Sequence, residues 1–185
     1  MHYLSKGKRG IVYVDVEGGR RVVIKKKRSE SAAVGALENE ARWLRILNKY
    51  GIGPKFIRSG EGMVVMEYIE GAPFVEWHEK HAAKERRKVT REIFQQCRIM
   101  DNLHVNKLEM HTPLKHIIVR RGKPILIDFE RCKLTLKPKN VTQFCQFLLT
   151  LGYDVDRVKL RKLLGEYKES YNKDTFEKIV RLFVG

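Results

Sequence analysis

The stretch Glu109–Glu130 constrains the fold of this chain more than any other part of the sequence. It contains two short β-type apolar runs, Ile117–Val119 and Ile125–Ile127, on either side of the basic, glycine-containing segment Arg120–Lys123. A glycine in a short connection between β-branched runs predicts a β-hairpin. A polar loop with two histidines enters this hairpin, and an acidic residue, Asp128, leaves it. The sequence therefore predicts a loop and a hairpin that carry several titratable side chains.

The first 70 residues predict a sheet that carries one helix. We expect three strands within residues 1–27 and two more over Phe56–Ser59 and Met63–Ile69. Between these strands, apolar residues recur at spacings of three and four, which predicts a helix with one buried face over Ala32–Tyr50. The residues of that face are Leu37, Ala41, Leu44 and Leu47. Two glycines and a proline in Gly51–Pro54 end the helix.

The rest of the chain, residues 71–185, predicts a mostly helical unit around the hairpin. Helices are expected over 73–80, 85–106, from Asn140 onward, from Asp154 to about Tyr167, and over 172–184. Asn140 and Asp154 are the expected N-caps of their helices. The predicted fold class is therefore α+β, with a five-stranded N-terminal unit over residues 1–70 and a helical unit over residues 71–185.

The charge of the chain is strongly positive, at +16 formal units over 185 residues. Of this excess, +14 lies within the first 140 residues, so it is not a basic tail. Lysine, arginine and glutamate enrichment in a heat-adapted protein is the plain alternative, but it normally raises both signs together. A polyanionic partner explains the excess better, and nucleic acid is the commonest such partner.

Several classes of protein are disfavoured by the same sequence. No apolar run approaches the roughly 20 residues that a membrane-spanning helix needs, and the first residues lack the pattern of a secretory signal. The three cysteines, Cys97, Cys132 and Cys145, are odd in number and have no CxxC spacing. They are expected to be reduced, buried thiols of a cytoplasmic protein.

Four further features are of the kind that bind a nucleotide. Glycines in Gly7–Gly10, between β-type segments, let backbone N–H groups approach phosphate oxygens. Lys25 near the end of the third strand can reach phosphates as a point charge, although Lys26 or Lys27 could equally be the inward residue. On the first helix, Glu40 lies beside the apolar stripe and can pair with the strand lysine, with Glu38 as its rival. Finally, a strand runs into an acidic-aromatic turn over residues 64–71, which can offer backbone groups to an adenine edge.

The order and spacing of these features resemble the protein-kinase-like superfamily, particularly its smallest members, the RIO-type kinases and the small kinase subunit of the KEOPS complex. The resemblance rests on Asn39–Leu47 followed by Gly51–Pro54, on Met66–Gly71 as a hinge, and on Ile127–Glu130 in the place of the D-F-G motif. It implies a minimal bilobal fold and an enzyme that uses ATP and Mg²⁺. By matching position it implies Lys25 as the phosphate lysine, Glu40 as its partner and Asp128 as the Mg²⁺ ligand. Gly7, Gly10, Glu67 and Ile69, from the features above, are the other expected nucleotide residues.

The chain departs from this family in its catalytic loop. The family reads H-R-D-x-x-x-x-N, and alignment on the following strand puts its aspartate on His111 and its asparagine on His116. Histidine can accept the proton of an acceptor hydroxyl, whereas Mg²⁺ prefers oxygen ligands. His116 is thus expected to contact phosphate or substrate, and Glu109 is the second candidate for the base. Glu130 replaces the D-F-G glycine and is a further candidate metal ligand.

The acceptor is expected to be a polyanion rather than a peptide. Only about ten residues separate Asp128 from the next predicted helix, so the long segment on which protein kinases dock a peptide is missing. Basic side chains of both units are the expected RNA contacts: Arg9, Lys27, Arg28, Lys115, Arg120, Arg121 and Lys123.

The segments 106–116 and 127–132 resemble a group of small archaeal proteins that includes RNA kinases acting on an internal ribose 2′-hydroxyl of tRNA. This resemblance implies a tRNA kinase, and the chain is expected to be a monomer. An atypical serine/threonine protein kinase and a nucleotide-gated RNA-binding pseudokinase are the alternatives.

Overall fold

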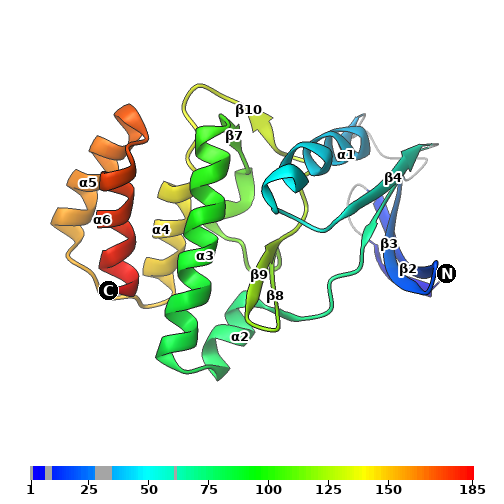
Figure 1. Cartoon of the computed structure of the whole chain (residues 1–185), viewed down its shortest axis with the longest axis horizontal. Coiled ribbons are helices and arrows are strands. Elements are labelled where there is room, and N and C mark those ends of the chain that lie inside the picture. The colour runs from blue at the N-terminus through cyan, green and yellow to red at the C-terminus, as the bar shows by residue number, and fades with distance from the viewer. Residues whose placement is uncertain (1, 7–9, 28–34, 61) are drawn as a thin grey trace. The chain divides into compact units, whose positions relative to one another are not determined.

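The computed structural model describes residues 2–6, 10–27, 35–60 and 62–185, and it divides the chain into two compact units (Figure 1). The first unit contains the chain up to Gly71 together with Ile125–Cys132. The second contains Ala72–Pro124 and Lys133–Gly185. The sequence-based division at residue 70 places Ile125–Cys132 in the later part, whereas contacts group this short segment with the first unit.

The first unit contains a five-stranded antiparallel sheet in the order β1-β2-β3-β5-β4. Its strands are β1 (His2–Lys6), β2 (Gly10–Glu17), β3 (Arg20–Lys27), β4 (Phe56–Gly60) and β5 (Met63–Glu67). The five strands predicted from the sequence are confirmed, although β5 ends two residues earlier than expected. Along β3, Val22 and Ile24 are buried with Val65, while Lys25 points to the other face because side chains alternate along a strand.

One helix, α1 (Ala36–Leu47), accompanies this sheet, and a short 3₁₀ helix, η1 (Asn48–Tyr50), follows it. The predicted apolar face is confirmed, since Leu37, Ala41, Leu44 and Leu47 are all buried. Trp43 and Glu40 are buried on the same helix. A glutamate without exposed surface needs a partner of opposite charge, and that partner is described below.

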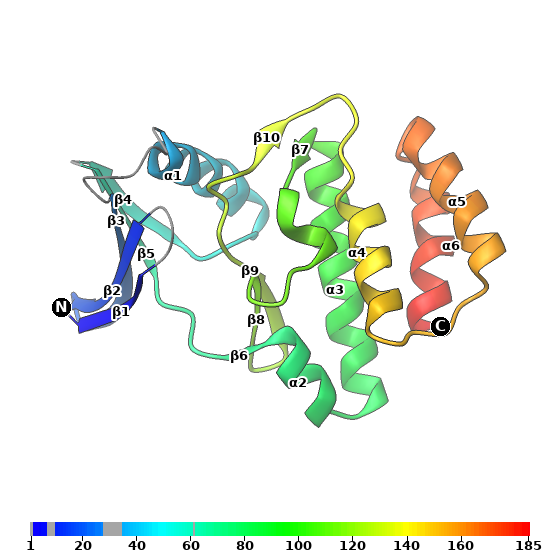
Figure 2. The same ribbon diagram turned by 180° about the vertical axis from the view of Figure 1, so that it is seen from behind.

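The second unit is mostly helical, as predicted (Figure 2). Its helices are α2 (Phe74–Lys80), α3 (Ala83–Asn102), α4 (Asn140–Thr150), α5 (Arg157–Ser170) and α6 (Lys173–Val184). Helix α3 packs against α4 and α6, and α5 packs against α6. Aromatic rings fill the spaces between these helices, with Phe94 of α3 lying 4.9 Å from Phe144 of α4 and 5.5 Å from Phe183 of α6 between ring centroids.

Short strands accompany the helices. Two of them, β7 (Val105–Asn106) and β10 (Lys133–Leu134), pair antiparallel. The others, β6 (Ala72–Pro73), β8 (Ile117–Arg120) and β9 (Lys123–Leu126), form a sheet in the order β6-β8-β9. The predicted hairpin is therefore confirmed as β8 and β9. Its two-residue turn has φ of 50° at Arg121 and 72° at Gly122, the backbone of a tight hairpin turn.

Three sequence-based expectations in this unit are wrong, one on a helix end and two on N-cap residues. Helix α3 ends at Asn102 and not at residue 106, because Val105 and Asn106 pair with β10 instead. Helix α4 starts with no side-chain cap, and Asn140 turns into the core. The cap of α5 is Asp156, whose carboxylate accepts the Lys159 N–H at 2.9 Å, rather than Asp154.

The remaining expectations on fold class hold. The chain is α+β, with a five-stranded sheet and one helix in the first unit and a mostly helical second unit, as a minimal kinase-like fold has. All three cysteines are buried free thiols. Among the described residues, no helix is both long enough and apolar enough to cross a bilayer.

Candidate functional site

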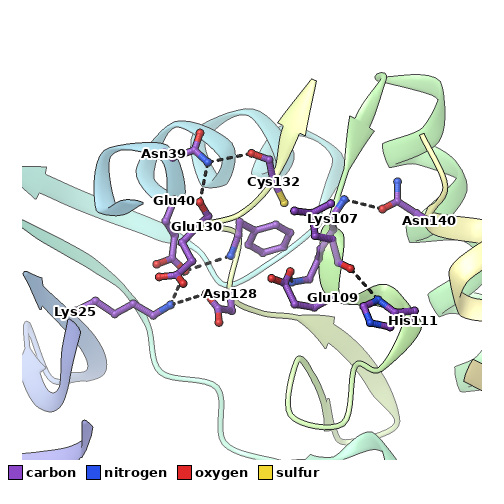
Figure 3. Close-up of polar contacts among 12 residues, drawn as sticks. Lys25, Asn39, Glu40, Lys107, Glu109, His111, Asp128, Glu130, Cys132 and Asn140 are labelled. Atoms are coloured by element: carbon purple, nitrogen blue, oxygen red, sulfur yellow. Dashed lines mark hydrogen bonds and ion pairs between the residues drawn. The ribbon is translucent and has the colours of Figure 1, made fainter. Parts of the chain in front are cut away.

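Three charged side chains from distant parts of the sequence meet in the first unit (Figure 3). The Lys25 Nζ on β3 donates to Glu40 Oε1 on α1 at 2.7 Å and lies 3.3 Å from Asp128 Oδ1. Glu40 has no exposed side-chain surface, Lys25 has 18% and Asp128 has 31%. Lys25 is thus held in place by the buried carboxylate of Glu40 and also contacts the partly exposed carboxylate of Asp128.

The structure selects among the candidates that the sequence left open. Lys25 is the lysine that faces α1, because Lys26 lies on the opposite face of β3, where its Nζ is 5.7 Å from the Tyr13 ring centroid. Lys27 ends the strand and is exposed. On α1, Glu40 is the inward carboxylate and Glu38 is exposed. A role for Lys25 and Glu40 toward a nucleotide stays a prediction.

The charges of this cluster stabilise one another. Burial alone lowers the pKa of Lys25, but the nearby carboxylates of Glu40 and Asp128 outweigh it, so the pKa of Lys25 is raised above its ordinary value. Burial raises the pKa of Glu40, and the ammonium of Lys25 opposes this shift. The Lys25 side chain is therefore a fixed positive charge at neutral pH, in a place where it is partly open to solvent.

Helix α1 also holds the chain on both sides of Asp128. The Asn39 amide donates to the backbone carbonyls of Glu130 at 2.8 Å and Cys132 at 3.0 Å, and the Trp43 indole donates to Cys132 at 2.9 Å. Glu40 Oε1 accepts the Phe129 N–H at 3.4 Å. Asp128 itself has a φ of 65°, a left-handed conformation that costs a non-glycine residue about 1–2 kcal/mol. The surrounding hydrogen bonds fix this strained position and hence the direction of the carboxylate.

The residues present fit the Mg²⁺ ion that the kinase-like resemblance implies. Asp128 and Glu130 supply hard oxygen donors two residues apart, and the charge of Glu130 also raises the pKa of Lys25. The described residues contain no group of three or more His, Cys, Asp or Glu side chains arranged to hold a metal on their own. A site with one or two carboxylates suits Mg²⁺, which keeps waters and takes its other ligands from substrate phosphates.

The other expected nucleotide residues lie around the same sheet. Gly10 begins β2, and a Cβ on it would come within 2.9 Å of the Lys26 carbonyl oxygen, so a larger residue does not fit there. Glu67 ends β5, with its N–H bonded to the Lys55 carbonyl at 2.9 Å. Ile69 follows and is buried. Gly7 and two of the expected RNA contacts, Arg9 and Arg28, lie outside the described residues.

The polar loop of the second unit runs from β7 through a short 3₁₀ helix, η2 (Leu108–His111). At its start, Lys107 has no exposed surface, and its Nζ lies 3.7 Å from Glu109 Oε2. Glu109 has 15% of its side chain exposed. The loop therefore begins with a charge pair that is almost completely shielded from solvent.

His111 closes the 3₁₀ helix and is exposed. Its Nδ1 lies 3.0 Å from the Leu108 carbonyl oxygen. The contact is the dashed line that ends at His111 in Figure 3. A carbonyl only accepts hydrogen bonds, so Nδ1 carries the hydrogen and Nε2 of the neutral ring keeps its lone pair. His116 is half-buried just before β8, and its N–H donates to the Pro113 carbonyl at 3.0 Å. Their catalytic roles stay predictions.

A hydrogen-bonded centre under this loop was not expected from the sequence. The Asn140 side chain accepts the Lys107 N–H at 2.8 Å and donates to the Val105 carbonyl at 2.6 Å and to Asp101 Oδ1 at 2.7 Å. Asp101 also accepts from the Tyr167 hydroxyl at 3.1 Å. Burial raises the pKa of Asp101 to about 6, although hydrogen bonds from Asn140 and Val141 oppose the shift. Because asparagine at a predicted helix start is usually an N-cap, the sequence did not indicate that the Asn140 side chain is buried and hydrogen-bonded in the core.

The expected RNA contacts of the second unit are mostly at the surface. Lys115, Arg121 and Lys123 are exposed, and Arg120 is half-buried. Arg121 lies in the β8–β9 turn and Lys123 is the first residue of β9, so both lie at the turn end of the hairpin. Lys27 is likewise exposed at the end of β3 in the first unit. Contact of these side chains with RNA stays a prediction.

Comparison with known proteins supports the kinase-like interpretation in its broad form. The chain is 33% identical over 93 residues to the KEOPS complex subunit Bud32 of Pyrococcus abyssi. This match spans 49% of the present chain and 41% of Bud32, so less than half of that relative is represented. No model of a protein family matches the sequence. Together with the α+β architecture, the match supports a place in the protein-kinase-like superfamily.

Proposed function

We propose that this protein is an ATP-dependent kinase that transfers the γ-phosphate to an internal ribose 2′-hydroxyl of tRNA. The observation that carries the phosphotransferase part is the cluster in which Lys25 Nζ contacts Glu40 at 2.7 Å and Asp128 at 3.3 Å. Three chain segments contribute to it. One of them, Ile125–Cys132, belongs to the first unit although the chain before and after it belongs to the second. A cationic side chain beside an open carboxylate suits a phosphate chain with its metal ion.

In the first unit, Lys25 binds the negatively charged phosphate chain of ATP as a point charge. Glu40 keeps the ammonium in place, because a buried carboxylate cannot be separated from its counter-ion without a large cost. Asp128 and Glu130 would hold Mg²⁺, which would supply positive charge to neutralise the β- and γ-phosphates.

In the second unit, His111 accepts the proton of the acceptor hydroxyl on Nε2, the nitrogen left with a lone pair by the Nδ1 hydrogen bond to Leu108. The acceptor oxygen forms a bond to the γ-phosphorus, the bond from that phosphorus to the β–γ bridging oxygen breaks, and ADP leaves. Glu109 beside Lys107 is the alternative base. His116 contacts the phosphate or the substrate.

RNA is the acceptor that the charges favour. The chain between Asp128 and α4 is short and contains no platform for an extended peptide. Arg121, Lys123 and Lys115 are exposed cations near the loop in sequence and within the same unit. A ribose hydroxyl is a weak nucleophile, so binding the surrounding phosphates would supply much of the rate by holding the hydroxyl in place.

The test uses ATP radiolabelled in the γ-phosphate with mixed tRNA and a generic protein as competing acceptors. Alkali cleaves RNA through the 2′-hydroxyl, so a phosphorylated 2′-position leaves the label in an alkali-resistant dinucleotide. A terminal phosphate would instead appear on a mononucleotide. Label in the dinucleotide is the expected result, and label in protein alone would overturn the RNA acceptor. The absence of transfer with ATP still bound would indicate a pseudokinase.

A second candidate is an atypical serine/threonine protein kinase, which the similarity to Bud32, a subunit of the KEOPS complex, favours. The variants His111→Gln and Glu109→Gln separate the two possible bases under either function. The variant of the true base is expected to lose about 100-fold or more in transfer while keeping ATP binding. The other variant should retain most of its activity.

A further inference from the structure

The segment Lys133–Lys139, between β10 and α4, has the composition of a binding surface. It reads Lys-Leu-Thr-Leu-Lys-Pro-Lys, and no acidic residue occurs between Arg131 and Asp154. Lys133, Lys137 and Lys139 are exposed, and within the described part of the chain no ion pair joins them to an acidic side chain. A local excess of one charge, without compensating carboxylates, attracts a polyanion.

Two leucines accompany these lysines at the surface. Leu134 is 60% exposed, and Leu136 is 85% exposed, more than any other large apolar side chain in the described part of the chain. Single exposed leucines need no explanation, but two of them alternating with lysines on one short segment form a mixed apolar and cationic surface. Such a surface can pack against a sugar or an unstacked base while the ammonium groups bind phosphates.

The backbone of the segment is held firmly despite its exposed side chains. Strand β10 pairs with β7, and the Thr135 N–H donates to the His104 carbonyl at 2.9 Å. Further on, the Lys139 N–H donates to Asn106 Oδ1 at 2.8 Å. Pro138 is buried, and its carbonyl accepts the Tyr171 hydroxyl at 3.2 Å. A segment whose backbone is already ordered loses little backbone entropy when it binds a partner.

These anchors tie the segment to the loop that carries the proposed base. His104 lies immediately before β7, and Asn106 ends it. Strand β7 continues through Lys107 into the 3₁₀ helix that ends at His111. His104 itself has a φ of 55°, an unfavourable conformation for a non-glycine residue, which the pairing of β7 with β10 helps to maintain. The segment and the loop are therefore parts of one hydrogen-bonded structure in the second unit.

We propose that Lys133–Lys139 is an RNA-binding surface that holds the acceptor strand beside the His111 loop. The lysines bind backbone phosphates, and Leu136 packs against an unpaired nucleotide. This inference rests on the proposed function for the identity of the RNA, but binding can be measured without transfer.

The test measures the affinity of the full chain for labelled mixed tRNA, without ATP, between about 50 and 200 mM salt. The variant K133A/K137A/K139A is expected to bind about tenfold or more weakly, with the slope of log affinity against log salt lower by about 2. The matched control K84A/K168A/K178A removes three exposed lysines that are dispersed over α3, α5 and α6. Its affinity should fall by less than about threefold. Equal losses in both variants, or no loss in either, would overturn the proposal.

Two further measurements sharpen the result. Leu136→Ser should weaken tRNA binding about threefold or more and leave the salt slope unchanged, because it removes apolar contact and no charge. Polyglutamate replaces tRNA in a parallel titration. If the chain prefers polyglutamate and K133A/K137A/K139A loses that binding instead, the surface binds an acidic protein and the RNA proposal is overturned.

The same variants separate this inference from the proposed function. In the transfer assay, K133A/K137A/K139A should raise the KM for tRNA about tenfold and leave kcat within about twofold, because binding changes and the chemical step does not. If the wild-type protein binds tRNA through this surface but transfers no phosphate, the proposed function is overturned and the binding surface is not. Transfer to tRNA with unaltered binding in the variant would remove the surface alone.

Discussion

Lys25 Nζ and Glu40 Oε1 lie 2.7 Å apart, and the glutamate of this pair has no exposed side-chain surface. The buried carboxylate of Glu40 is thus neutralised by the ammonium of Lys25, which is itself partly exposed. Replacing Lys25 affects two properties that are usually studied separately, because the lysine is both the expected phosphate ligand and the counter-ion of a buried charge. The two effects can be separated by pairing variants at positions 25, 26 and 40.

Lys25→Met is expected to abolish phosphate transfer and to lower the free energy of unfolding by about 3–5 kcal/mol, since it leaves Glu40 buried without its partner. Urea-induced unfolding and the γ-phosphate assay measure the two effects. Adding Glu40→Gln removes the uncompensated charge and should restore most of the stability, but not the activity. A double variant as unstable as Lys25→Met would contradict this account of the pair.

Lys26→Met is the matched control for that experiment. Lys26 is adjacent on β3 but faces the Tyr13 ring on the opposite side of the sheet. Its loss should cost about 0.5–1 kcal/mol, the contribution of an exposed cation–π contact. Transfer by this variant should remain near that of the wild type. An equal loss of activity at both positions would mean that Lys25 has no special role.

Gly53→Ala should destabilise the first unit more than Gly51→Ala does. Both glycines have positive φ, 85° and 71°, so each alanine carries a backbone cost of about 1–2 kcal/mol. Only at Gly53 would the new Cβ collide, lying 2.8 Å from Phe129 Cε2 and 3.1 Å from Leu44 Cδ2, whereas nothing lies within 4 Å at Gly51. Overpacking adds about 1–3 kcal/mol.

Thermal unfolding of the two glycine variants measures the difference. Phe129→Leu in the Gly53→Ala background should recover part of the extra loss, because the ring is the group that the methyl meets. Equal destabilisation at positions 51 and 53 would show that the Phe129 ring moves away freely. That result would also argue against a fixed position for the neighbouring Asp128.

Asn140→Ala should lower the free energy of unfolding by about 3–5 kcal/mol. It leaves the buried Lys107 N–H, the Val105 carbonyl and Asp101 each without one partner, and every such loss costs about 1–3 kcal/mol. Tyr167→Phe removes only the hydroxyl bonded to Asp101 and should cost about 1 kcal/mol. Urea unfolding compares them. A loss below about 1 kcal/mol in Asn140→Ala would mean that water replaces the amide.

The stability of the chain should depend on pH through Asp101. Burial raises the pKa of its carboxyl from 3.8 to about 6 in the folded chain, so the folded state binds the proton more tightly than the unfolded state. The stabilising contribution is therefore complete below about pH 4 and is lost as the pH rises through about 6. The difference in unfolding free energy between wild type and Asp101→Asn should fall by up to about 3 kcal/mol over that range.

Urea unfolding of both proteins at a series of pH values tests this sign. Groups other than Asp101 contribute to both curves and largely cancel in the difference. A difference that grows with pH would mean that the hydrogen bonds from Asn140 and Tyr167 outweigh burial and favour the charged carboxylate.

The sequence predicted those features that depend on local patterns. The apolar face of α1 follows from residues at spacings of three and four, and the β8–β9 hairpin follows from a glycine between β-branched runs. Glu40 was also expected to point inward, because it lies beside that face. Because side chains alternate along a strand, Lys25 and Lys27 of β3 were expected on one face and Lys26 on the other. The structure identified Lys25 as the lysine that contacts Glu40.

What the sequence could not provide depends on contacts between distant residues. Asn140 was expected to cap a helix, since its local position is that of a cap, but its partners Asp101, Val105 and Lys107 lie 33 to 39 residues away. The end of α3 was misplaced for the same reason, because Val105 and Asn106 pair with β10. Periodicity contains no information on such partners, which only the folded chain brings together.

The assignment of Ile125–Cys132 to the first unit has a consequence for how this protein could be divided. The chain passes between the units three times, after Gly71, after Pro124 and after Cys132. A gene split at residue 71 would therefore encode a first fragment without Asp128 and without the carbonyls that Asn39 and Trp43 bind. The other fragment would contain Asp128 without Lys25 and Glu40, so no single cut in the chain at residue 71 leaves the cluster around Lys25 intact.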